Sequence, residues 1–547
     1  MTEPSDPPES VPDLVRAVAA RHPDVLALAW PGEELTYREL VDRAASVATA
    51  LPAGQPVAVR MSSGPRQVIA CLAVLMADAR LVCLGAGDVG ERGRAVLTDL
   101  RPTWIVVDGE QPEDGLVTWY REELSGRVLD LTTVPAGGAG ERAVPGSADG
   151  WAYVTYTSGS TGRPKGIPQG HSTLAQFVTW FAREFRVEVG ARVAQWAAPG
   201  YDASLVEAFG ALVAGGTLCP VSDRLRANPE KLADWLAAEG ITHFQTVPSF
   251  ARQLLGALGE PGERPAALGH LLLAGEPLPG ELADGLRAAL PGVRLVNLYG
   301  PTESILATWY EVDGPHDGMV PIGRAIPGRR VVVLDEHDRP CPPGVTGQIV
   351  IESPYVTPGY VGAAGENGAA FRPIRGTGPA APRCYRTGDR GRLRPDGTLE
   401  FGGREDFQIK FNGVRVELTD IEVALAADAS VAECAVVPVA DAQGLVVRLV
   451  AYVVPGEPGG TAATITPWRA ALRRRFGKAT PPVTFRTLTR LPRTVGGKVD
   501  RRRLPDPGPA TAQVPRARDS GAAPDGQSAV LTPDDTQTTS TTLLQTH

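Results

Sequence analysis

Lysine and clustered metal ligands are both scarce in this chain of 547 residues. Only five of the 54 basic residues are lysines, so arginine carries most of the positive charge. A lysine that stands at a functional position would act as a compact, mobile ammonium rather than as a planar fork. The six cysteines include no Cys-x-x-Cys pair, and the seven histidines include no His-x-x-x-His pair. The pattern therefore argues against a disulfide framework and against a zinc site of clustered ligands.

The chain also lacks the long apolar run of a membrane span and the positive charge of a nucleic-acid-binding protein. The longest notable apolar run, residues 67–77, is too short to cross a bilayer. The first ten residues, MTEPSDPPES, are polar and acidic, so they do not resemble a signal peptide. The net charge is −8, whereas a protein that mainly holds nucleic acid is usually basic. We therefore expect a cytoplasmic protein with neither a membrane nor a nucleic-acid partner.

Apolar strands alternate with amphipathic helices over residues 150–300. The sequence predicts strands at 151–157, 193–198, 241–247, 271–274 and 293–298, and helices at 171–185 and 205–213. Such alternation is typical of an α/β architecture with largely parallel sheets. Shorter strands predicted at 331–335, 348–352 and 398–401 lie among glycine and proline turns, and they indicate a β-rich subdomain.

The pattern of predicted helices and strands changes after Gly402 and Gly403. Helices near 419–427 and 467–476 and strands near 431–438 and 446–454 predict a small α+β domain. From Asp506 onward the chain has no aromatic residue and is rich in Pro, Ala, Thr and Asp, a composition typical of disorder. We therefore expect three parts: a large α/β core at 1–405, the small domain at 406–505 and a disordered tail at 506–547.

One loop carries the strongest chemical signal. Residues 157–166 read TSGSTGRPKG and follow a predicted strand. Three glycines and four hydroxyl side chains make a flexible loop whose N–H and O–H groups can surround phosphate oxygens. The loop lacks the GxxxxGK[ST] pattern, so it is not a Walker A loop.

Further motifs follow one another along residues 35–504. They are LTYREL at 35–40, YDAS at 201–204, NLYGPTE at 297–303, PIGR at 321–324, YRTGD at 385–389, GRED at 403–406, QIKFNG at 408–413 and GKVDR at 497–501. With this set in this order, the chain resembles the adenylate-forming (AMP-binding) superfamily, and within it a free-standing amino-acid adenylation domain of nonribosomal peptide synthetase type. The resemblance implies a large N-terminal adenylation core of layered α/β subdomains with a β-rich subdomain, and a small mobile α+β domain after it. The segment LMADARLVCL at 75–84 departs from the usual LKAGxAYVPxDP.

The resemblance implies two half-reactions with ATP and Mg²⁺ as cofactors. A carboxylate attacks the α-phosphate of ATP to give an acyl-adenylate, and a thiol then displaces AMP to form a thioester. Lys498, Thr302 and Glu303 are the implied catalytic residues. Glu303 is also the implied Mg²⁺ ligand, since a hard carboxylate suits a hard cation.

The implied ATP-binding residues would contact the phosphates, the adenine and the ribose. In the family pattern Tyr299 stacks on adenine, while Asp389 and Arg404 bond the ribose hydroxyls. The full implied set is Thr157, Ser158, Gly159, Ser160, Thr161, Gly162, Lys165, Gly275, Glu276, Pro277, Asn297, Tyr299, Gly300, Asp389 and Arg404.

Asp202 is the residue that indicates which acid is activated. In amino-acid-activating members this aspartate faces the substrate α-ammonium, which supplies the partner that a buried carboxylate needs. The implied substrate pocket consists of Asp202, Ala203, Val206, Gln245, Leu272, Ala274, Leu298, Ile305 and Leu306. Apart from Asp202 this wall is apolar except for Gln245, so it suits a small or medium apolar L-amino acid, including a proline-like ring. Gln245 could instead bond a polar side chain.

The small domain is expected to move between the two half-reactions. Asp406 matches the hinge of the family, and Lys410 and Gly413 match the loop that faces the thiol in the second state. Lys498 lies near the end of the same domain and would swing inward for adenylation, where its single charge would lie between the carboxylate and the α-phosphate.

The implied partner is a separate phosphopantetheinylated carrier protein, because no carrier motif follows residue 504. A small activator protein of MbtH type is a further implied partner, and the sequence leaves the need for it open. The basic run at 469–503 could be a solvated face or could attract an acidic carrier. Two alternatives stay open: an acyl- or aryl-CoA ligase of the same superfamily, and a non-catalytic scaffold. Intact Lys498, Glu303 and Asp389 argue against the scaffold.

We predict that Lys498→Ala slows amino-acid-dependent ATP–pyrophosphate exchange by about 10²–10³-fold, because one preorganised donor to the developing charge is lost. The same variant, supplied with preformed aminoacyl-AMP, should acylate a carrier at close to the wild-type rate. Lys231→Ala serves as the control, because Lys231 matches no motif. Equal slowing of both half-reactions would contradict this role for Lys498.

Overall fold

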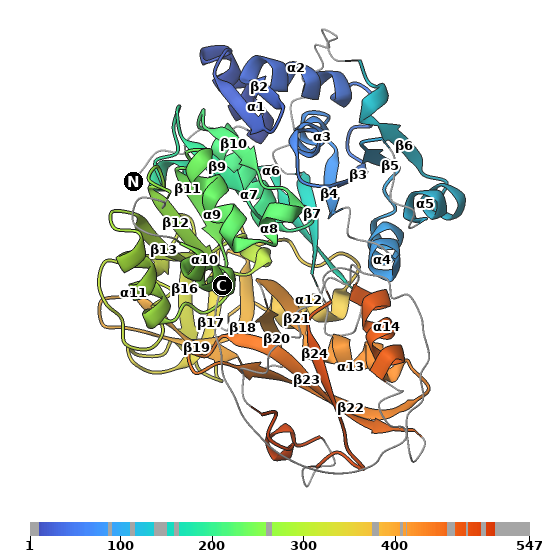
Figure 1. Ribbon diagram of the computed structural model, residues 1–547, viewed down its shortest axis with the longest axis vertical. Helices are drawn as coiled ribbons and strands as arrows, with labels where there is room; N and C mark the ends of the chain where they lie inside the picture. Colours follow the sequence, from blue (N-terminus) through green and yellow to red (C-terminus); the bar gives the residue numbers. More distant parts are fainter. Residues whose placement is uncertain are drawn as a thin grey trace, which may run out of the picture. The chain divides into compact units, whose positions relative to one another are not determined.

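The computed structural model describes most of the chain. The described residues are 10–85, 90–109, 115–135, 150–157, 164–258, 265–374, 382–404, 408–411, 413–456, 465–476, 480–493 and 499–508. They form a nine-stranded, a six-stranded, a four-stranded and a three-stranded sheet and one separate hairpin (Figure 1). The α/β class expected from the alternating pattern is confirmed.

The nine-stranded sheet has the order β15-β14-β13-β12-β11-β9-β10-β1-β2. Its strands are β1 (Leu26–Trp30), β2 (Glu33–Thr36), β9 (Arg192–Gln195), β10 (Thr217–Pro220), β11 (His243–Thr246), β12 (His270–Ala274), β13 (Arg294–Tyr299), β14 (Thr308–Glu311) and β15 (Arg324–Ala325). The strands from β13 to β1 in this order run parallel, and antiparallel pairs close both edges. A parallel sheet collects the carboxyl ends of its strands at one side, so the segments after β9, β11, β12 and β13 lie near one another.

A six-stranded sheet has the order β6-β5-β3-β4-β7-β8. Its strands are β3 (Pro56–Met61), β4 (Arg80–Gly85), β5 (Trp104–Val107), β6 (Arg127–Asp130), β7 (Trp151–Thr157) and β8 (Lys165–Gly170), all parallel except the antiparallel pair of β7 with β8. Of this sheet, only β7 is predicted by the sequence pattern. The segment that departs from the family pattern contributes the end of a helix and most of β4.

Helices cover both faces of the nine-stranded sheet. The helices of this part are α1 (Val11–Arg21), α2 (Tyr37–Ala48), α3 (Pro65–Met76), α4 (Gly90–Leu100), α5 (Leu116–Leu124), α6 (His171–Glu184), α7 (Asp202–Leu212), α8 (Asp223–Arg226), α9 (Pro229–Ala238), α10 (Pro248–Ala257) and α11 (Gly280–Ala289). One apolar core joins α3, α6 and α7 to strands of both large sheets. A second core packs α9, α10 and α11 against the other face of the nine-stranded sheet, where Phe244 and Leu271 point. Helix α3 is buried on every side, which explains its continuous apolar sequence.

The β-rich subdomain expected after residue 330 is a four-stranded antiparallel sheet. Its order is β16 (Arg330–Leu334), β17 (Gly347–Glu352), β18 (Cys384–Leu393) and β19 (Leu399–Arg404), and α12 (Ala364–Ala370) accompanies it. The described segments 331–335, 348–352 and 398–401 of the prediction correspond to β16, β17 and β19.

The segment after residue 407 has a core of its own. Its elements are the hairpin β20 (Gln408–Phe411) and β21 (Val414–Glu417), then α13 (Leu418–Ala426), β22 (Val431–Ala440), β23 (Val446–Pro455), α14 (Ile465–Phe476) and β24 (Val483–Thr487). Ile421, Trp468 and Leu472 lie in an apolar cluster made only of residues from this segment. The described chain continues past residue 505 to Gly508, and Arg448 donates to the carbonyl oxygens of Pro507 and Gly508. The rest of the expected tail, residues 509–547, lies outside the described residues.

The LTYREL motif proves to be a structural signal. Thr36 caps helix α2, accepting from the N–H of Glu39, and the Glu39 carboxylate accepts from the N–H of Thr36 at 2.8 Å. These reciprocal bonds satisfy two orphan donors of the helix start. The hydroxyl of Tyr37, which is fully buried, donates to the carbonyl of Gly216 at 2.7 Å and ties the helix to the strand beside it. The motif therefore starts and anchors α2 rather than contacting a ligand.

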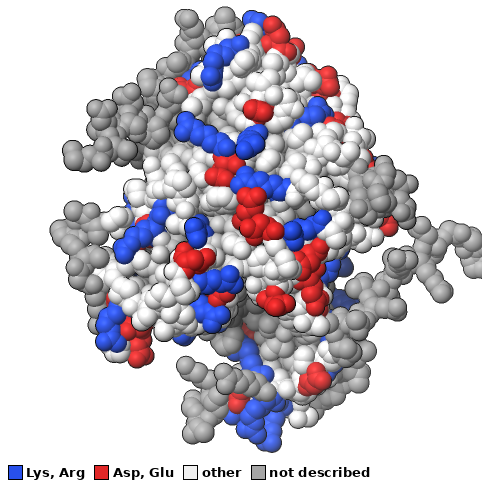
Figure 2. All heavy atoms as spheres, turned by 90° about the vertical axis from the view of Figure 1, so that its left-hand side faces the viewer, with Lys and Arg blue, Asp and Glu red and all other residues white. Residues whose placement is uncertain are grey.

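Arginine makes most of the surface ion pairs, as its abundance over lysine suggests. Arg294, for example, pairs with Glu184 at 2.9 Å and with Glu311 at 2.8 Å. On the face that Figure 2 shows, basic and acidic side chains lie close to one another in scattered groups, with uncharged surface between the groups. In the described part of the chain, none of the helices has both the length and the apolar character that a bilayer span requires.

We predict that Thr36→Ala lowers the free energy of unfolding by about 1 kcal/mol, since the N-cap hydrogen bond is lost. The midpoint of urea unfolding measures this loss. Glu34→Ala, an exposed neighbour on β2, is the control and should change the midpoint little. If both variants lower the midpoint equally, the capping interpretation of LTYREL is wrong.

Candidate active site

A cavity of about 640 Å³ lies where the parallel strands of the nine-stranded sheet end. Residues just after β9, β11, β12 and β13 line one wall, and β18, β19 and the hairpin β20–β21 contribute the others. Many implied site residues line it: Thr157, Asp202, Ala203, Val206, Gln245, Ala274, Gly275, Glu276, Pro277, Leu298, Tyr299, Gly300, Thr302, Ile305, Leu306, Asp389, Arg404, Lys410 and Gly413. The family motifs therefore converge on one cavity.

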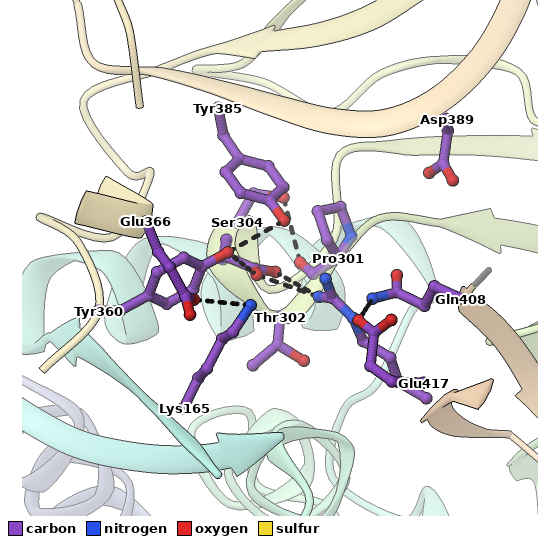
Figure 3. A network of polar contacts seen from close by, with 12 residues as sticks. Lys165, Pro301, Thr302, Ser304, Tyr360, Glu366, Tyr385, Asp389, Gln408 and Glu417 are labelled. Carbon is purple, nitrogen blue, oxygen red and sulfur yellow. Dashed lines mark hydrogen bonds and ion pairs between the residues drawn. The ribbon is translucent and has the colours of Figure 1, made fainter. Parts of the chain in front are cut away.

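Four implied residues lie elsewhere. Leu272 belongs to the apolar core, because it stands two residues before the end of β12. Asn297 is buried and its amide donates to the carbonyl of Pro321 at 2.9 Å, so it holds the loop behind the site. Lys165 pairs with Glu366 at 2.8 Å and lies over the ring of Tyr360 (Figure 3). Glu303 lies behind the cavity wall, fully buried.

Several implied residues fall outside the described residues. They are Ser158, Gly159, Ser160, Thr161, Gly162, the hinge candidate Asp406 and the catalytic candidate Lys498. Thr157, at the end of β7, is the described residue of the loop implied to bind phosphate that lines the cavity.

Asp202 is the first residue of α7. The predicted helix began only at 205, but the structure starts it three residues earlier, after the extended Tyr201. The carboxylate of Asp202 accepts from the N–H of Ala203 at 3.0 Å. Burial raises the pKa of Asp202 to about 6, although bonds from Thr302 and Ala203 oppose the rise. This carboxylate is therefore only partly solvated. A cation that entered the cavity beside it would replace part of the missing solvation.

Tyr299, Asp389 and Arg404 form one polar cluster. The hydroxyl of Tyr299 donates to Asp389 Oδ2 at 2.5 Å, and Arg404 makes an ion pair with the same carboxylate. Asp389 on β18 and Arg404 on β19 are cross-strand partners, so the four-stranded sheet fixes their spacing. The ring of Tyr299 closes the end of β13 beside the cavity. The three residues implied to bind the nucleotide are thus already joined by a hydrogen bond and an ion pair in this structure.

Glu303 lies in a second polar cluster on the short helix that spans Thr302–Ser304. The hydroxyl of Tyr360 donates to Glu303 Oε1 at 2.7 Å, and Arg415 Nη1 lies 3.0 Å and 3.2 Å from the two carboxylate oxygens. Burial alone would raise the pKa of Glu303, but the charge of Arg415 and the bond from Tyr360 hold that pKa below its usual range. Figure 3 shows Tyr360 and Tyr385 side by side, with their hydroxyl oxygens 3.4 Å apart.

The donor set fits a magnesium ion that arrives with a nucleotide. In the part of the chain that the structure describes, no group of three or more Asp, Glu, His or Cys side chains could cage a metal. Mg²⁺ is usually held by one or two carboxylates together with phosphate oxygens and water. A single buried carboxylate such as Glu303 agrees with that mode of binding.

The hairpin β20–β21 reaches into the cavity through its turn. Gly413 has φ +74, a conformation that favours glycine, and its N–H donates to Glu276 Oε1 at 2.8 Å. A Cβ at Gly413 would lie 2.3 Å from Val247 Cγ1. Burial lowers the pKa of Lys410, which faces the cavity from β20.

The cavity wall is more polar than the sequence analysis predicted. Trp196, Glu207 and Thr246 also line it, and none of them was anticipated. Trp196 Nε1, Glu207 Oε1, Gln245 Oε1 and Thr246 Oγ1 are buried and have no hydrogen-bond partner within the described residues. The rule that ligands gather after parallel strands would have found Trp196 and Thr246, which stand at the ends of β9 and β11. No spacing signal marks Glu207 or Arg415.

The chain matches two family models in sequence. Residues 15–361 match the model described as AMP-binding enzyme, and residues 420–498 match its C-terminal domain. The phosphinothricin tripeptide synthetase PhsB of Streptomyces viridochromogenes is 39% identical over 534 residues, which is 94% of this chain and 43% of PhsB. The chain therefore spans less than half the length of this relative.

Two solved structures share the fold. One is holo-PA1221, described as an NRPS protein containing adenylation and PCP domains, with a TM-score of 0.76 and 25% identity; the match covers 90% of this chain and 83% of that one. The other is o-succinylbenzoate CoA synthetase of Bacillus subtilis, with a TM-score of 0.77 and 22% identity, over 90% of this chain and 98% of that one. The second likeness concerns the fold alone.

We predict that Gly413→Ala prevents the turn of the hairpin from packing against Val247. The added Cβ would strain a backbone of positive φ, and it would also lie too close to the Val247 side chain. Hydrogen exchange of the peptide that covers 408–417 should be faster than in the wild type. Gly397→Ala is the matched control, since Gly397 also has a positive φ but has open space around it. Unchanged exchange in Gly413→Ala would contradict the observed seating of the hairpin.

Proposed function

Because the chain belongs to the AMP-binding enzyme family, we propose that it activates an amino acid as aminoacyl-AMP and transfers it to the phosphopantetheine thiol of a separate carrier protein. The chain is an ATP-dependent adenylating ligase by its family and its relatives. The choice of an amino acid as the acid and of a carrier as the acceptor is our proposal.

The observation that carries the proposal is the half-buried carboxylate of Asp202 at the wall of the cavity, the pKa of which is raised by burial. An ionised carboxylate in a buried site needs a cationic partner. The α-ammonium of an amino acid supplies such a partner, whereas a simple carboxylic acid does not. Asp202 also lies in the same cavity as Thr302 and Tyr299, so an amino acid bound there would lie beside the nucleotide residues.

In the first half-reaction, a carboxylate oxygen of the amino acid attacks the α-phosphorus of ATP. The bond from that phosphorus to the bridging oxygen breaks, and pyrophosphate leaves with the electron pair. Tyr299, Asp389 and Arg404 would orient the adenosine, and Glu303 would hold the metal ion. Mg²⁺, when bound, would neutralise charge on the phosphate oxygens. Lys498 keeps its proposed place beside the carboxylate and the α-phosphate.

In the second half-reaction, the thiol sulfur attacks the acyl carbon and AMP leaves with the electron pair of the broken bond, while the thiol proton passes to solvent. The family pattern assigns Lys410 and Gly413 to the loop that faces the thiol in this state. Both residues line the cavity, which supports the view that this arrangement corresponds to thioester formation.

The side chain of the substrate would lie against both apolar and polar groups. Val206, Ala274 and Leu298 favour a small or medium apolar side chain, including a proline-like ring. The unpaired oxygen of Gln245 instead favours a side chain that donates a hydrogen bond, because a buried acceptor left unpaired costs free energy. Both options stay within the class of neutral amino acids.

The wider setting follows from the names of the relatives. PhsB is described as a peptide synthetase and PA1221 as an NRPS protein with adenylation and PCP domains. We therefore propose a role in nonribosomal peptide biosynthesis, including antibiotic biosynthesis. The cytoplasmic location, the separate carrier and an activator of MbtH type remain parts of this proposal. An acyl- or aryl-CoA ligase is the alternative, and Asp202 disfavours it.

We predict that Asp202→Asn lowers kcat/KM for the amino acid in ATP–pyrophosphate exchange by about 10–100-fold, since a charge-assisted hydrogen bond is lost. Binding of ATP itself should persist. Asp42→Asn, on the exposed face of α2, is the control. In the wild type, kcat/KM should fall as the pH drops through about 6, because protonation of Asp202 removes the charge that holds the ammonium. Unchanged kcat/KM in Asp202→Asn would contradict the proposal.

A further inference from the structure

Arg415 forms an ion pair with Glu303, the carboxylate that the proposed function assigns to a metal ion. Its Nη1 lies 3.0 Å from Oε1 and 3.2 Å from Oε2 of Glu303, and Tyr360 donates to Oε1 as well. The Glu303 side chain is fully buried, and that of Arg415 is 17% exposed. Neither the sequence motifs nor the family resemblance marked Arg415 as a site residue.

The hairpin presents two cations to the acids of the core. Lys410 on β20 and Arg415 on β21 are cross-strand partners, so both side chains project from one face of the hairpin. Like charges directly opposite one another destabilise a strand pair. The acids that the hairpin meets, above all Glu303, therefore offset the repulsion between its two cations. Gln408 and Glu417, also cross-strand partners, bond to each other at the base of the hairpin (Figure 3).

A guanidinium and a divalent cation would compete for this buried carboxylate. Arg415 Nη1 lies against both oxygens of Glu303 and Tyr360 donates to one of them, so a hard cation would have to approach the carboxylate beside these donors. The two positive groups would also repel each other in a buried, weakly screened site. Binding of one at Glu303 therefore disfavours binding of the other.

We propose that Arg415 and the metal ion of the bound nucleotide compete for Glu303. This proposal rests on the proposed function. Arg415 holds the carboxylate while no metal is bound, and it must leave before Glu303 can take a metal ion. Since Arg415 belongs to the hairpin, its departure withdraws the hairpin β20–β21 from the cavity. Once Glu303 holds no metal ion, Arg415 would return to it and bring Lys410 and Gly413 back into the cavity. Arg415 is thus a positioning residue that couples metal binding at Glu303 to the position of the hairpin.

The first measurement uses the wild-type full chain and needs no variant. Hydrogen exchange of the peptide covering 408–417 is followed with Mn²⁺ as the probe, with and without the non-reacting nucleotide α,β-methylene-ATP. Exchange should be slow in the empty protein and should become at least about tenfold faster when Mn²⁺ and the nucleotide are both saturating. Slow exchange under both conditions would overturn the competition.

The second measurement compares the affinity for Mn²⁺, read by electron paramagnetic resonance in saturating α,β-methylene-ATP. Arg415→Met should bind Mn²⁺ about tenfold more tightly than the wild type, because the internal competitor is gone. Arg448→Met is the matched control, since Arg448 bonds the carbonyl oxygens of Pro507 and Gly508 and not Glu303. The control should stay within about twofold of the wild type.

The two proposals fail in different ways. Equal or weaker Mn²⁺ binding in Arg415→Met, with nucleotide still bound, overturns the competition and leaves the proposed function standing. Failure of the wild-type chain to bind the nucleotide at all overturns both.

Discussion

The carboxylates buried at and around one cavity set the constraint on which the rest of this site depends. Asp202 and Asp389 line the cavity and Glu303 lies just behind its wall. Removing a charged group from water is costly unless a partner of opposite charge replaces the water. Arg404 partners Asp389 and Arg415 partners Glu303. Two of these acids, Asp389 and Glu303, are therefore matched to a cation of the chain itself.

The fold brings these groups together through the direction of its strands. The parallel strands β9, β11, β12 and β13 end at one side of the nine-stranded sheet, and the residues that follow them form one wall of the cavity. The four-stranded sheet holds Asp389 and Arg404 in register. The hairpin β20–β21 adds the last cations, and the missing Cβ of Gly413 allows its turn to approach Val247. A ligand that supplies its own cations would change which of these ion pairs within the chain persist.

The sequence predicted the parts of this structure that carry a period or a motif. Alternating strands and helices indicated the α/β class, and the ordered motifs indicated many of the residues that line the cavity. Leu272 was misplaced because only the last residues of a strand reach the cavity, and Ala274 stands two residues nearer to that end. Arg415 was missed because its partner Glu303 is 112 residues away along the chain. LTYREL was correctly found, but its capping bonds show that it shapes a helix rather than a ligand site.

The central claim is that the cavity selects an amino acid by its ammonium group. The most direct test is ATP–pyrophosphate exchange with the full chain across the twenty amino acids, repeated with the des-amino analogue of each amino acid that responds. The account predicts exchange with one neutral amino acid or a few, and little with their des-amino analogues. Exchange driven by simple carboxylic acids and by no amino acid would contradict it.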